Sequence, residues 1–230
     1  MRIFFGIIIG LVLAVAIAFA AAKYALGDLG DVAGRDKSKD VTQTLDLAGF
    51  DKIDIGGVFE VEVSVGGDYS VVVSGAEDEM ARLDAAVENG VLKLDQDEVR
   101  FGKRNWRHQG MTAVISLPDL NGFDLAGVAD GEVTGVDADD FRVDLAGVGD
   151  LALSGTCGRL DAHVSGVGEL DAKALECREA DVDVSGVGSA SVFASEAVDA
   201  SVSGIGSIDI YGAPSQIEKS TSFISSISVK

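Results

Sequence analysis

Three carboxylates recur at one position of an internal repeat and could together bind a divalent cation. Asp130, Asp150 and Glu169 each stand three residues after the glycine of their repeat copy. Because Ca²⁺ takes several oxygen ligands in irregular geometry, this column predicts at most a weak Ca²⁺ site, and no other cofactor is expected. The calcium-binding nonapeptide repeat needs a spacing that is missing here, which favours the alternative of a solvated acidic face that keeps the protein soluble.

One short segment gathers positive charge around the only tryptophan of the chain. It carries Arg100, Lys103, Arg104, Trp106 and Arg107, in a chain whose formal net charge is −20. A basic loop with an exposed aromatic side chain suits an anionic headgroup, a glycan or an acidic partner. The alternatives are a loop that contacts the protein's own acids, or a tryptophan that covers the first coil of the repeat.

Two cysteines could form a disulfide. Cys157 and Cys177 each lie nine residues before the glycine of their repeat copy, so they occupy equivalent positions in adjacent copies. Stacked strands lie about 4.8 Å apart, within the Cα separation of about 4.4–6.8 Å that a disulfide spans, and an exported compartment permits oxidation. The alternative is a pair of small buried thiols whose geometry does not suit the bond.

Enzyme motifs are missing from the sequence. It contains no H-E-x-x-H and no G-x-S-x-G, and its two histidines are far apart. Residues 147–152 fit a G-x-G-x-x-A nucleotide motif, but the helix that this motif needs is not predicted to follow. We therefore expect no catalysis. The enzyme alternative is a carbohydrate-active β-helix in which aligned carboxylates hold calcium and a basic residue acts as base.

The elements that must position these residues come from a repeat that begins after Leu117. Its glycines are 20, 19, 20 and 18 residues apart, at Gly127, Gly147, Gly166, Gly186 and Gly204. A degenerate copy follows at residues 222–229. Self-similarity at a fixed period near 20 residues indicates a solenoid, here of about six coils.

Apolar columns run through the copies and alternate with polar ones at the period of a β-strand. One column stands two residues before the glycine and another six residues after it. A third stands one residue after it, at Val128, Val148, Val167, Val187, Ile205 and Ile224. We expect all three to face the interior of a parallel β-helix whose tight corners need glycine.

Residues 41–117 precede the repeats in the same domain and show another pattern. Short apolar runs separated by glycine pairs predict an antiparallel or mixed β region. Glu77–Val87 predicts one short helix, because its apolar side chains share a face. Asn89-Gly90 then predicts a hairpin turn. The repeats occupy residues 118–230.

The first residues predict export. Arg2 precedes an uncharged apolar run over residues 3–22, which fits a secretory signal peptide. At about 1.5 Å per residue the run is also long enough to cross a bilayer core of about 30 Å, so a membrane-anchor helix stays open. Either segment 1–22 places the rest in the periplasm or at the cell surface. Residues 23–40 are expected to form a tether.

Composition excludes several classes of protein. The chain has 29 glycines, only 2 prolines and 47% apolar residues, which excludes a disordered linker and collagen. Its net charge of −20 disfavours nucleic acid as a partner. Two cysteines are too few for a disulfide-stapled miniprotein.

The order of these features over residues 41–229 resembles a known family, the putative auto-transporter adhesin "head GIN" domain, a domain of unknown function. The motifs that carry the resemblance are, in order, Ile53-x-Ile55-x-Gly57-Val58, Val71-Val72-Val73-x-Gly75, Asn89-Gly90-Val91-Leu92-Lys93-Leu94, Leu117-Pro118 and the Ser/Ala-Gly-Val-Gly coils. The resemblance implies a right-handed β-helix on the bacterial envelope. It transfers no catalytic residue.

We therefore expect an exported, envelope-associated, non-catalytic adhesion or interaction module. Its partner would be an unidentified envelope or surface protein or a glycan, with the membrane contacted through residues 3–22 if they are retained. The structural alternative is an envelope protein that assembles into a homo-oligomer through the open ends of its β-helix.

Overall fold

The structure is a computed structural model that describes residues 40–96, 110–222 and 224–230. The chain divides into two compact units, residues 1–37 and 38–230, and every described residue belongs to the second. The predicted signal or anchor segment lies outside the described residues, as does the tether up to residue 39. No helix in the described part is long and apolar enough to span a membrane.

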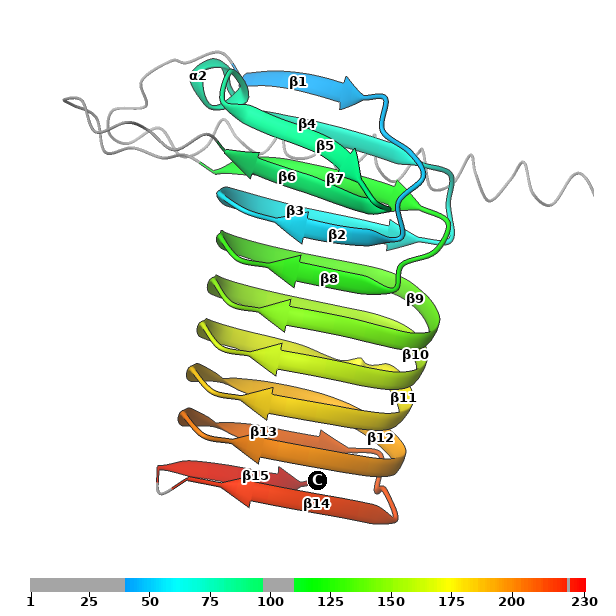
Figure 1. The fold of residues 1–230 in the computed structure, drawn as a ribbon, viewed down its shortest axis with the longest axis vertical. Coiled ribbons are helices and arrows are strands. Elements are labelled where there is room, and N and C mark those ends of the chain that lie inside the picture. The colour runs from blue at the N-terminus through cyan, green and yellow to red at the C-terminus, as the bar shows by residue number, and fades with distance from the viewer. Residues whose placement is uncertain (1–39, 97–109, 223) are drawn as a thin grey trace, which may run out of the picture. The chain divides into compact units, whose positions relative to one another are not determined.

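Four long strands build the solenoid, because each copy of the repeat carries the same alternation of apolar and polar residues. They are β9 (Val128–Leu145), β10 (Val148–Val164), β11 (Val167–Val184) and β12 (Val187–Val202). Each pairs in parallel with the next, and the register joins equivalent positions of neighbouring copies. Figure 1 shows the resulting stack of coils. The predicted all-β parallel solenoid is confirmed.

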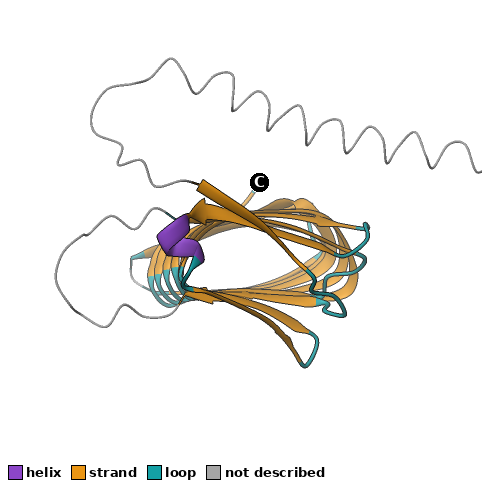
Figure 2. Cartoon of the chain, turned by 90° about the horizontal axis from the view of Figure 1, so that it is seen from above, coloured by secondary structure: helices purple, strands orange, loops and turns teal. Residues whose placement is uncertain are grey.

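Each long strand bends near its middle and so contributes to both faces of a flattened coil (Figure 2). The ladder register shifts at this bend, for example between Leu153 and Gly155 of β10. The first half of β9 pairs with β3 (Val58–Val65), whereas its second half pairs with β8 (Gly122–Leu125). The two faces therefore meet at the bend on one edge and at the glycine corner on the other.

Glycine is required at the corners because successive coils approach each other so closely there. A Cβ atom on Gly147 would lie 1.9 Å from the carbonyl oxygen of Gly127, and one on Gly166 would lie 1.9 Å from that of Gly147. A side chain does not fit at such distances. The same carbonyl oxygen of Gly127 accepts a hydrogen bond from the backbone N–H of Val148 at 2.9 Å. The glycine period of the sequence follows from this packing.

The solenoid begins earlier in the sequence than the visible repeat. β2 (Lys52–Ile55) pairs in parallel with β8, and β3 pairs in parallel with β9, so the two form a first coil. Gly57 occupies the corner, since a Cβ atom on Gly127 would lie 2.1 Å from its carbonyl oxygen. Residues 66–121 are therefore an insertion between the first coil and the second.

The described strands of this insertion cover the upper end of the stack (Figure 1). β6 (Val91–Gln96) pairs in parallel with β2, and β7 (Met111–Leu117) pairs in parallel with β3. β5 (Leu83–Glu88) then pairs antiparallel with β6, and β4 (Ser70–Ala76) pairs antiparallel with β7. β1 (Asp40–Leu45) completes the cap against β4. The predicted mixed β region thus contributes both the first coil, through β2 and β3, and the cap above it.

The predicted helix is shorter than expected. α2 spans only Glu77–Met80, and the segment that follows is β5 rather than more helix. Asn89 and Gly90, both at positive φ (52° and 81°), form the turn that folds β5 back onto β6. An isolated helix of about ten residues is marginal, so pairing with β6 outweighs the helical pattern of the sequence.

The lower end of the solenoid is split into shorter strands. β13 (Ile205–Tyr211) pairs with the first half of β12, and β14 (Gln216–Thr221) pairs with its second half. β15 (Ser225–Val229) adds a last strand on β13. The degenerate sixth copy therefore contributes only part of a coil.

The core confirms two of the three apolar columns and corrects the third. The columns two residues before and six residues after the corner glycine are buried in all five copies that carry the glycine, whereas Val229 of the degenerate copy is exposed. The column one residue after the glycine is instead half exposed: Val128 51%, Val148 50%, Val167 52%, Val187 50% and Ile205 53%. The strand period of two continues through the corner, so the residues one and three positions after the glycine point outward.

Candidate functional site

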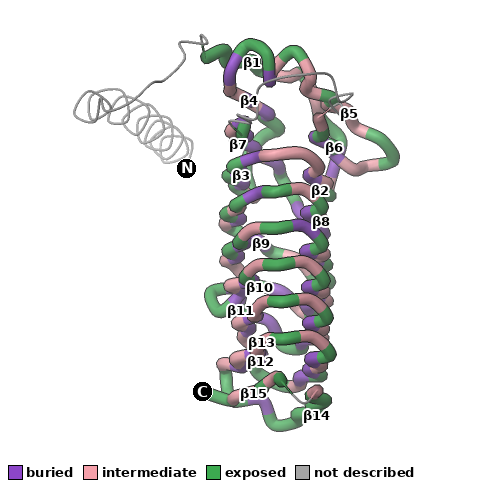
Figure 3. The backbone as a smooth tube through the Cα atoms, turned by 90° about the vertical axis from the view of Figure 1, so that its left-hand side faces the viewer, coloured by how far each residue is buried: buried purple, intermediate pink, exposed green. Residues whose placement is uncertain are grey.

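The glycine corners carry an exposed apolar row that we call the valine ladder. It consists of Val128, Val148, Val167, Val187 and Ile205, which are register partners from coil to coil. Together with Val58 of the first coil and the small residues of the corners, four of its members line a shallow open groove along this edge. Figure 3 looks onto the edge, where exposed and half-buried residues alternate along each coil.

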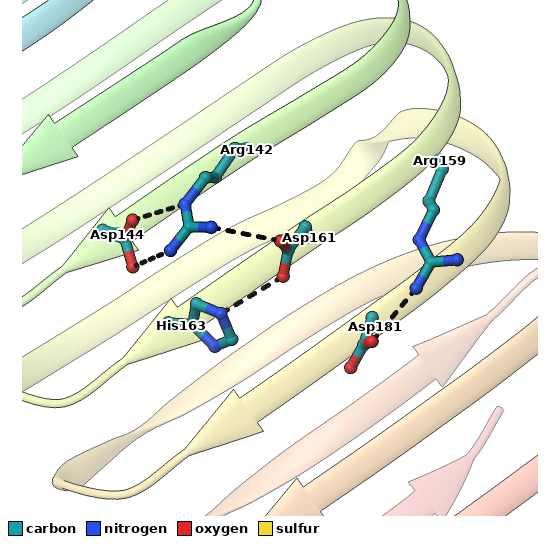
Figure 4. Close-up of polar contacts among 6 residues, drawn as sticks. All are labelled: Arg142, Asp144, Arg159, Asp161, His163 and Asp181. Carbon is teal, nitrogen blue, oxygen red and sulfur yellow. Dashed lines mark hydrogen bonds and ion pairs between the residues drawn. The ribbon is translucent and has the colours of Figure 1, made fainter.

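The face on one side of the ladder is a network of opposite charges (Figure 4). Arg142 Nε lies 2.8 Å from Asp144 Oδ2 on its own strand, and Arg142 Nη1 lies 3.6 Å from Asp161 Oδ2 on the next. The hydrogen bond that the Arg142 guanidinium donates to Asp144, together with the negative charge of that carboxylate, raises the pKa of the guanidinium. Cross-strand pairing of this kind offsets the repulsion between stacked carboxylates.

The same pattern continues on the coils below. His163 Nε2 lies 3.2 Å from Asp161 Oδ1, and Arg159 Nη2 lies 3.1 Å from Asp181 Oδ2. These side chains are all substantially exposed, so each pair contributes little to stability, about 0–1 kcal/mol. These ion pairs reduce the repulsion between neighbouring carboxylates on an acidic surface.

Asp124 stands out on this face because it is partly buried between two other acids. It pairs in register with Asp54 above and Asp144 below. Burial raises the pKa of the Asp124 carboxyl, and the charges of Asp144 and Asp54 raise it further, as does a hydrogen bond with Asp144. The column that contains Asp124 stands three residues before the corner glycine, and a column of exposed alanine and serine residues separates it from the valine ladder.

The predicted calcium column borders the ladder on its other side. Asp130 Oδ1 accepts a hydrogen bond from the backbone N–H of Asp150 at 3.2 Å, and Asp150 Oδ1 accepts one from that of Glu169 at 3.0 Å. The carboxylates thus bind the backbone of the next coil. Among the described residues, no three or more His, Cys, Asp or Glu side chains are grouped so that they could hold a metal ion.

Cys157 and Cys177 are brought together by the stacking of β10 on β11. They are direct register partners, their Cα atoms lie 4.4 Å apart, and their sulfur atoms are bonded. Both side chains are buried. This bond ties two adjacent coils to each other.

The predicted basic segment lies outside the described residues, with Arg100, Lys103, Arg104, Trp106 and Arg107. Its described neighbours are at the corner edge. The backbone N–H of Gly56 donates to the carbonyl oxygen of Leu94 at 2.8 Å, and that of Val58 donates to Gln96 Oε1 at 3.2 Å. The ends of β6 and β7 that bound residues 97–109 are thus next to the first glycine corner.

The exposure of the valine ladder was missed by the sequence reasoning, although a signal for it exists. Counting from the buried Leu125 and Val133 in steps of two reaches the corner glycine, never Val128. Between the corner and the bend, a column at an odd position is therefore external even when every member is apolar. The five β-branched side chains of the valine ladder therefore form an exposed apolar surface.

Comparisons with known proteins agree on one family. Residues 49–214 match the family model described as "Putative auto-transporter adhesin, head GIN domain". A putative adhesin from Bacteroides fragilis is 26% identical, with a TM-score of 0.71 over 84% of this chain and 98% of that chain. A putative adhesin from Parabacteroides distasonis shares the fold, at 16% identity and a TM-score of 0.50 over 84% and 98% of the two chains. No curated protein matches.

Proposed function

Because this chain belongs to the putative auto-transporter adhesin head GIN domain family, we propose that it is an exported, envelope-associated module that binds a partner and catalyses no reaction. The observation that carries this proposal is the valine ladder. Monomeric proteins seldom expose a contiguous row of large apolar side chains unless the row binds something. The similar structure from Bacteroides fragilis, itself described as a putative adhesin, supports the same class of role.

The charged groups on the described coils support binding rather than catalysis. Asp144 and Asp161 are engaged by Arg142, and Asp130 and Asp150 accept backbone hydrogen bonds from the next coil. Acids and bases used in catalysis need access to a substrate in a concave site. Here Asp130 and Asp150 hydrogen-bond the backbone of the next coil, and Asp161 and Arg142, which line a shallow polar groove, pair with each other.

Export rests on the sequence of residues 1–22. The same family relationship favours an envelope or surface location, because adhesins act outside the cell. The partner class is an envelope or surface protein or a glycan. The basic segment with Trp106 is a second place at which such a partner would bind.

Attachment of whole cells tests this proposal. The full chain is expressed in a non-adherent bacterial host, and its exposure is measured by labelling intact cells with a membrane-impermeant reagent. We expect labelled cells to attach to protein- or glycan-coated surfaces several-fold more than cells carrying an empty vector. Cells that display the chain without any gain in attachment would contradict a role in adhesion. Neutralising Arg100, Lys103, Arg104 and Arg107 together tests whether the basic segment contributes.

End-to-end assembly is a second candidate, favoured by the lower end of the solenoid. β14 pairs only with β12 and β15 only with β13, among the residues that the structure describes. All residues of β14 are exposed. Open strand edges can pair with another chain, although Glu218 and Lys219 on β14 oppose this. A sedimentation coefficient that rises with protein concentration, and that stops rising in Ile217→Lys, would support assembly.

A further inference from the structure

We propose that the valine ladder is the docking surface for a cationic amphipathic helix presented by the partner. This inference rests on the proposed function, because it states the chemistry of the partner that the module would bind. The occupant is a helix of about 16 residues with one apolar stripe and Lys or Arg on both flanks of that stripe. The length, the charge and the helical form each follow from a separate feature of the corner edge.

The length follows from the spacing of the coils. The ladder residues are register partners on successive parallel strands, and Val58 continues the row as the register partner of Val128. Strands in a sheet lie about 4.8 Å apart, so the six side chains from Val58 to Ile205 span about 24 Å. An α-helix rises about 1.5 Å per residue, so about 16 residues cover that span.

The ladder can be approached closely because its neighbours are small. The residue two positions before each valine is alanine or serine, and the residue directly before it is glycine. Gly149, Gly168 and Gly188 directly follow three of the ladder valines. Among the residues that the structure describes, no bulky side chain next to the ladder in the corner stands between these valines and a partner. Valine also has few rotamers to lose, so contact with its methyl groups costs little conformational entropy.

The charge follows from two acidic columns on either side of the ladder. The nearer column holds Glu60, Asp130, Asp150 and Glu169, at equivalent positions of four successive coils. The other column lies beyond the exposed alanines and serines of the corner and holds Asp54, Asp124, Asp144 and Asp183, with His163 between the last two. An apolar row between two negative rows is complementary to an apolar stripe between two positive ones. A second copy of this chain or an anionic membrane would instead bring like charges together, which costs free energy.

The helical form follows from matching repeat distances. Apolar side chains on one face of a helix recur about every 5.4 Å along the axis, against about 4.8 Å for the ladder. Side chains on one face of an extended strand recur about every 6.6 Å or more, so a strand loses register with the ladder within two or three coils. A helix with apolar side chains at i, i+3, i+4 and i+7 stays closer to register with the valine ladder over its whole length.

The test measures binding of a synthetic helix to the full chain. The probe is a fluorescent 18-residue peptide of leucine and lysine, with leucine at helical spacing. The protein is held in nanodiscs of zwitterionic lipid, and the signal from empty nanodiscs is subtracted. We expect saturable binding that a scrambled peptide of the same composition does not reproduce. A leucine–glutamate peptide of the same pattern should not bind.

Variants of the ladder decide whether the peptide binds where proposed. Val148→Ser combined with Val167→Ser should weaken binding about tenfold or more, because two apolar contacts are lost. The matched control is Val114→Ser on β7, a valine with a similar exposure of 46% that lies outside the ladder. Both sites are on the surface, so an unchanged melting temperature should verify that each variant is folded.

Variants of the acidic columns separate specific from general attraction. Asp150→Asn with Glu169→Gln should weaken binding and reduce its dependence on salt concentration. Asp199→Asn with Glu218→Gln removes the same charge from a column that does not border the ladder, and it should have a smaller effect. If the two double variants weaken peptide binding equally, the peptide is attracted by the overall negative charge of the protein, and the proposal is wrong.

Three further outcomes would also overturn the docking proposal. These are the absence of binding to the wild-type chain, binding that Val148→Ser with Val167→Ser leaves unchanged, and self-association of the chain that requires the ladder valines. The last outcome would show that the valine ladder binds a second copy of the chain. The cell-attachment experiment does not use this peptide. If the peptide does not bind, the docking proposal is wrong, but the proposed function is still tested separately by cell attachment.

Discussion

Asp124 and Asp144 are direct register partners on adjacent parallel strands, so two carboxyl groups lie side by side on the outside of the solenoid. Burial, the neighbouring charges and the hydrogen bond between the two raise the pKa of Asp124. The pair shows how stacking of a repeat forces like charges together, because whatever one copy places outside, the next copy places directly beneath it.

The first prediction concerns this acid. Because the folded protein holds the proton of Asp124 more tightly than the unfolded chain, the stability that this proton contributes is lost as pH rises through the raised pKa. Asp124→Asn should therefore stabilise the protein at pH 7, by about 0.2–1 kcal/mol. The gain should shrink as pH falls toward the ordinary value of 3.8. Thermal melts at pH 7 and at low pH measure it.

Asp68→Asn, at an exposed turn, is the control for removing one negative charge. It should change the melting temperature less than Asp124→Asn does at pH 7. A destabilised Asp124→Asn at pH 7 would show that the carboxylate is needed in its charged form, against the expectation from its surroundings.

The disulfide leads to the second prediction. The bond between Cys157 and Cys177 closes a loop with a sequence separation of 20 residues. A loop of this length restricts the unfolded chain by about 3 kcal/mol, so Cys157→Ala with Cys177→Ala should lower the melting temperature by roughly 10 °C. The unreduced wild-type protein, denatured and treated with a thiol reagent, should incorporate no label. Two labels per chain would contradict the bond.

The third prediction concerns the charged face. Arg142 contacts Asp144 and Asp161 on two successive strands, and its side chain is 57% exposed. Arg142→Met should therefore destabilise the protein only slightly, by about 0.2–1 kcal/mol, through the repulsion that it leaves between the acids. High salt should reduce this loss by screening the repulsion. Urea denaturation at low and high ionic strength measures both effects, and a loss that grows with salt would contradict this explanation.

The corner glycines support the fourth prediction. Gly166→Ala would place a methyl group against the carbonyl oxygen of Gly147, and the backbone of the neighbouring coil cannot move away without breaking the ladder. We expect a loss of stability of about 3 kcal/mol or more. Gly122→Ala is the matched control, because its Cβ atom would lie 3.5 Å from the nearest atoms, an ordinary contact. Equal melting temperatures of the two variants would show that the corners can relax.

Much of the fold could be predicted because it repeats. Each copy confirms the others, so the spacing from Gly127 to Gly204 predicts parallel stacking without any knowledge of long-range contacts. The same logic placed Cys157 beside Cys177, as the bonded pair in the structure has it. The first coil was missed because Gly57 stands 70 residues before Gly127, so its period is hidden by the insertion between them.

The helix over Glu77–Val87 was predicted from local periodicity, and there the local signal was misleading. Leu83–Glu88 is extended because β6 offers it a complete set of antiparallel partners. Local propensity amounts to tenths of a kilocalorie per residue, whereas strand pairing and burial are tertiary terms of larger size. The conformation of such a segment depends on the strand with which it pairs, and that strand is not part of the local sequence pattern.

The sequence by itself determined the period, the corners, the acidic character and the family of this protein, because each depends on composition or on the spacing of like residues. Only the tertiary structure decided which columns are inside. Val128 and Leu125 are both apolar and three residues apart, yet Leu125 is buried and Val128 is 51% exposed. The difference arises because the pleat continues through a glycine corner, and the direction of a side chain depends on that path rather than on its own hydrophobicity.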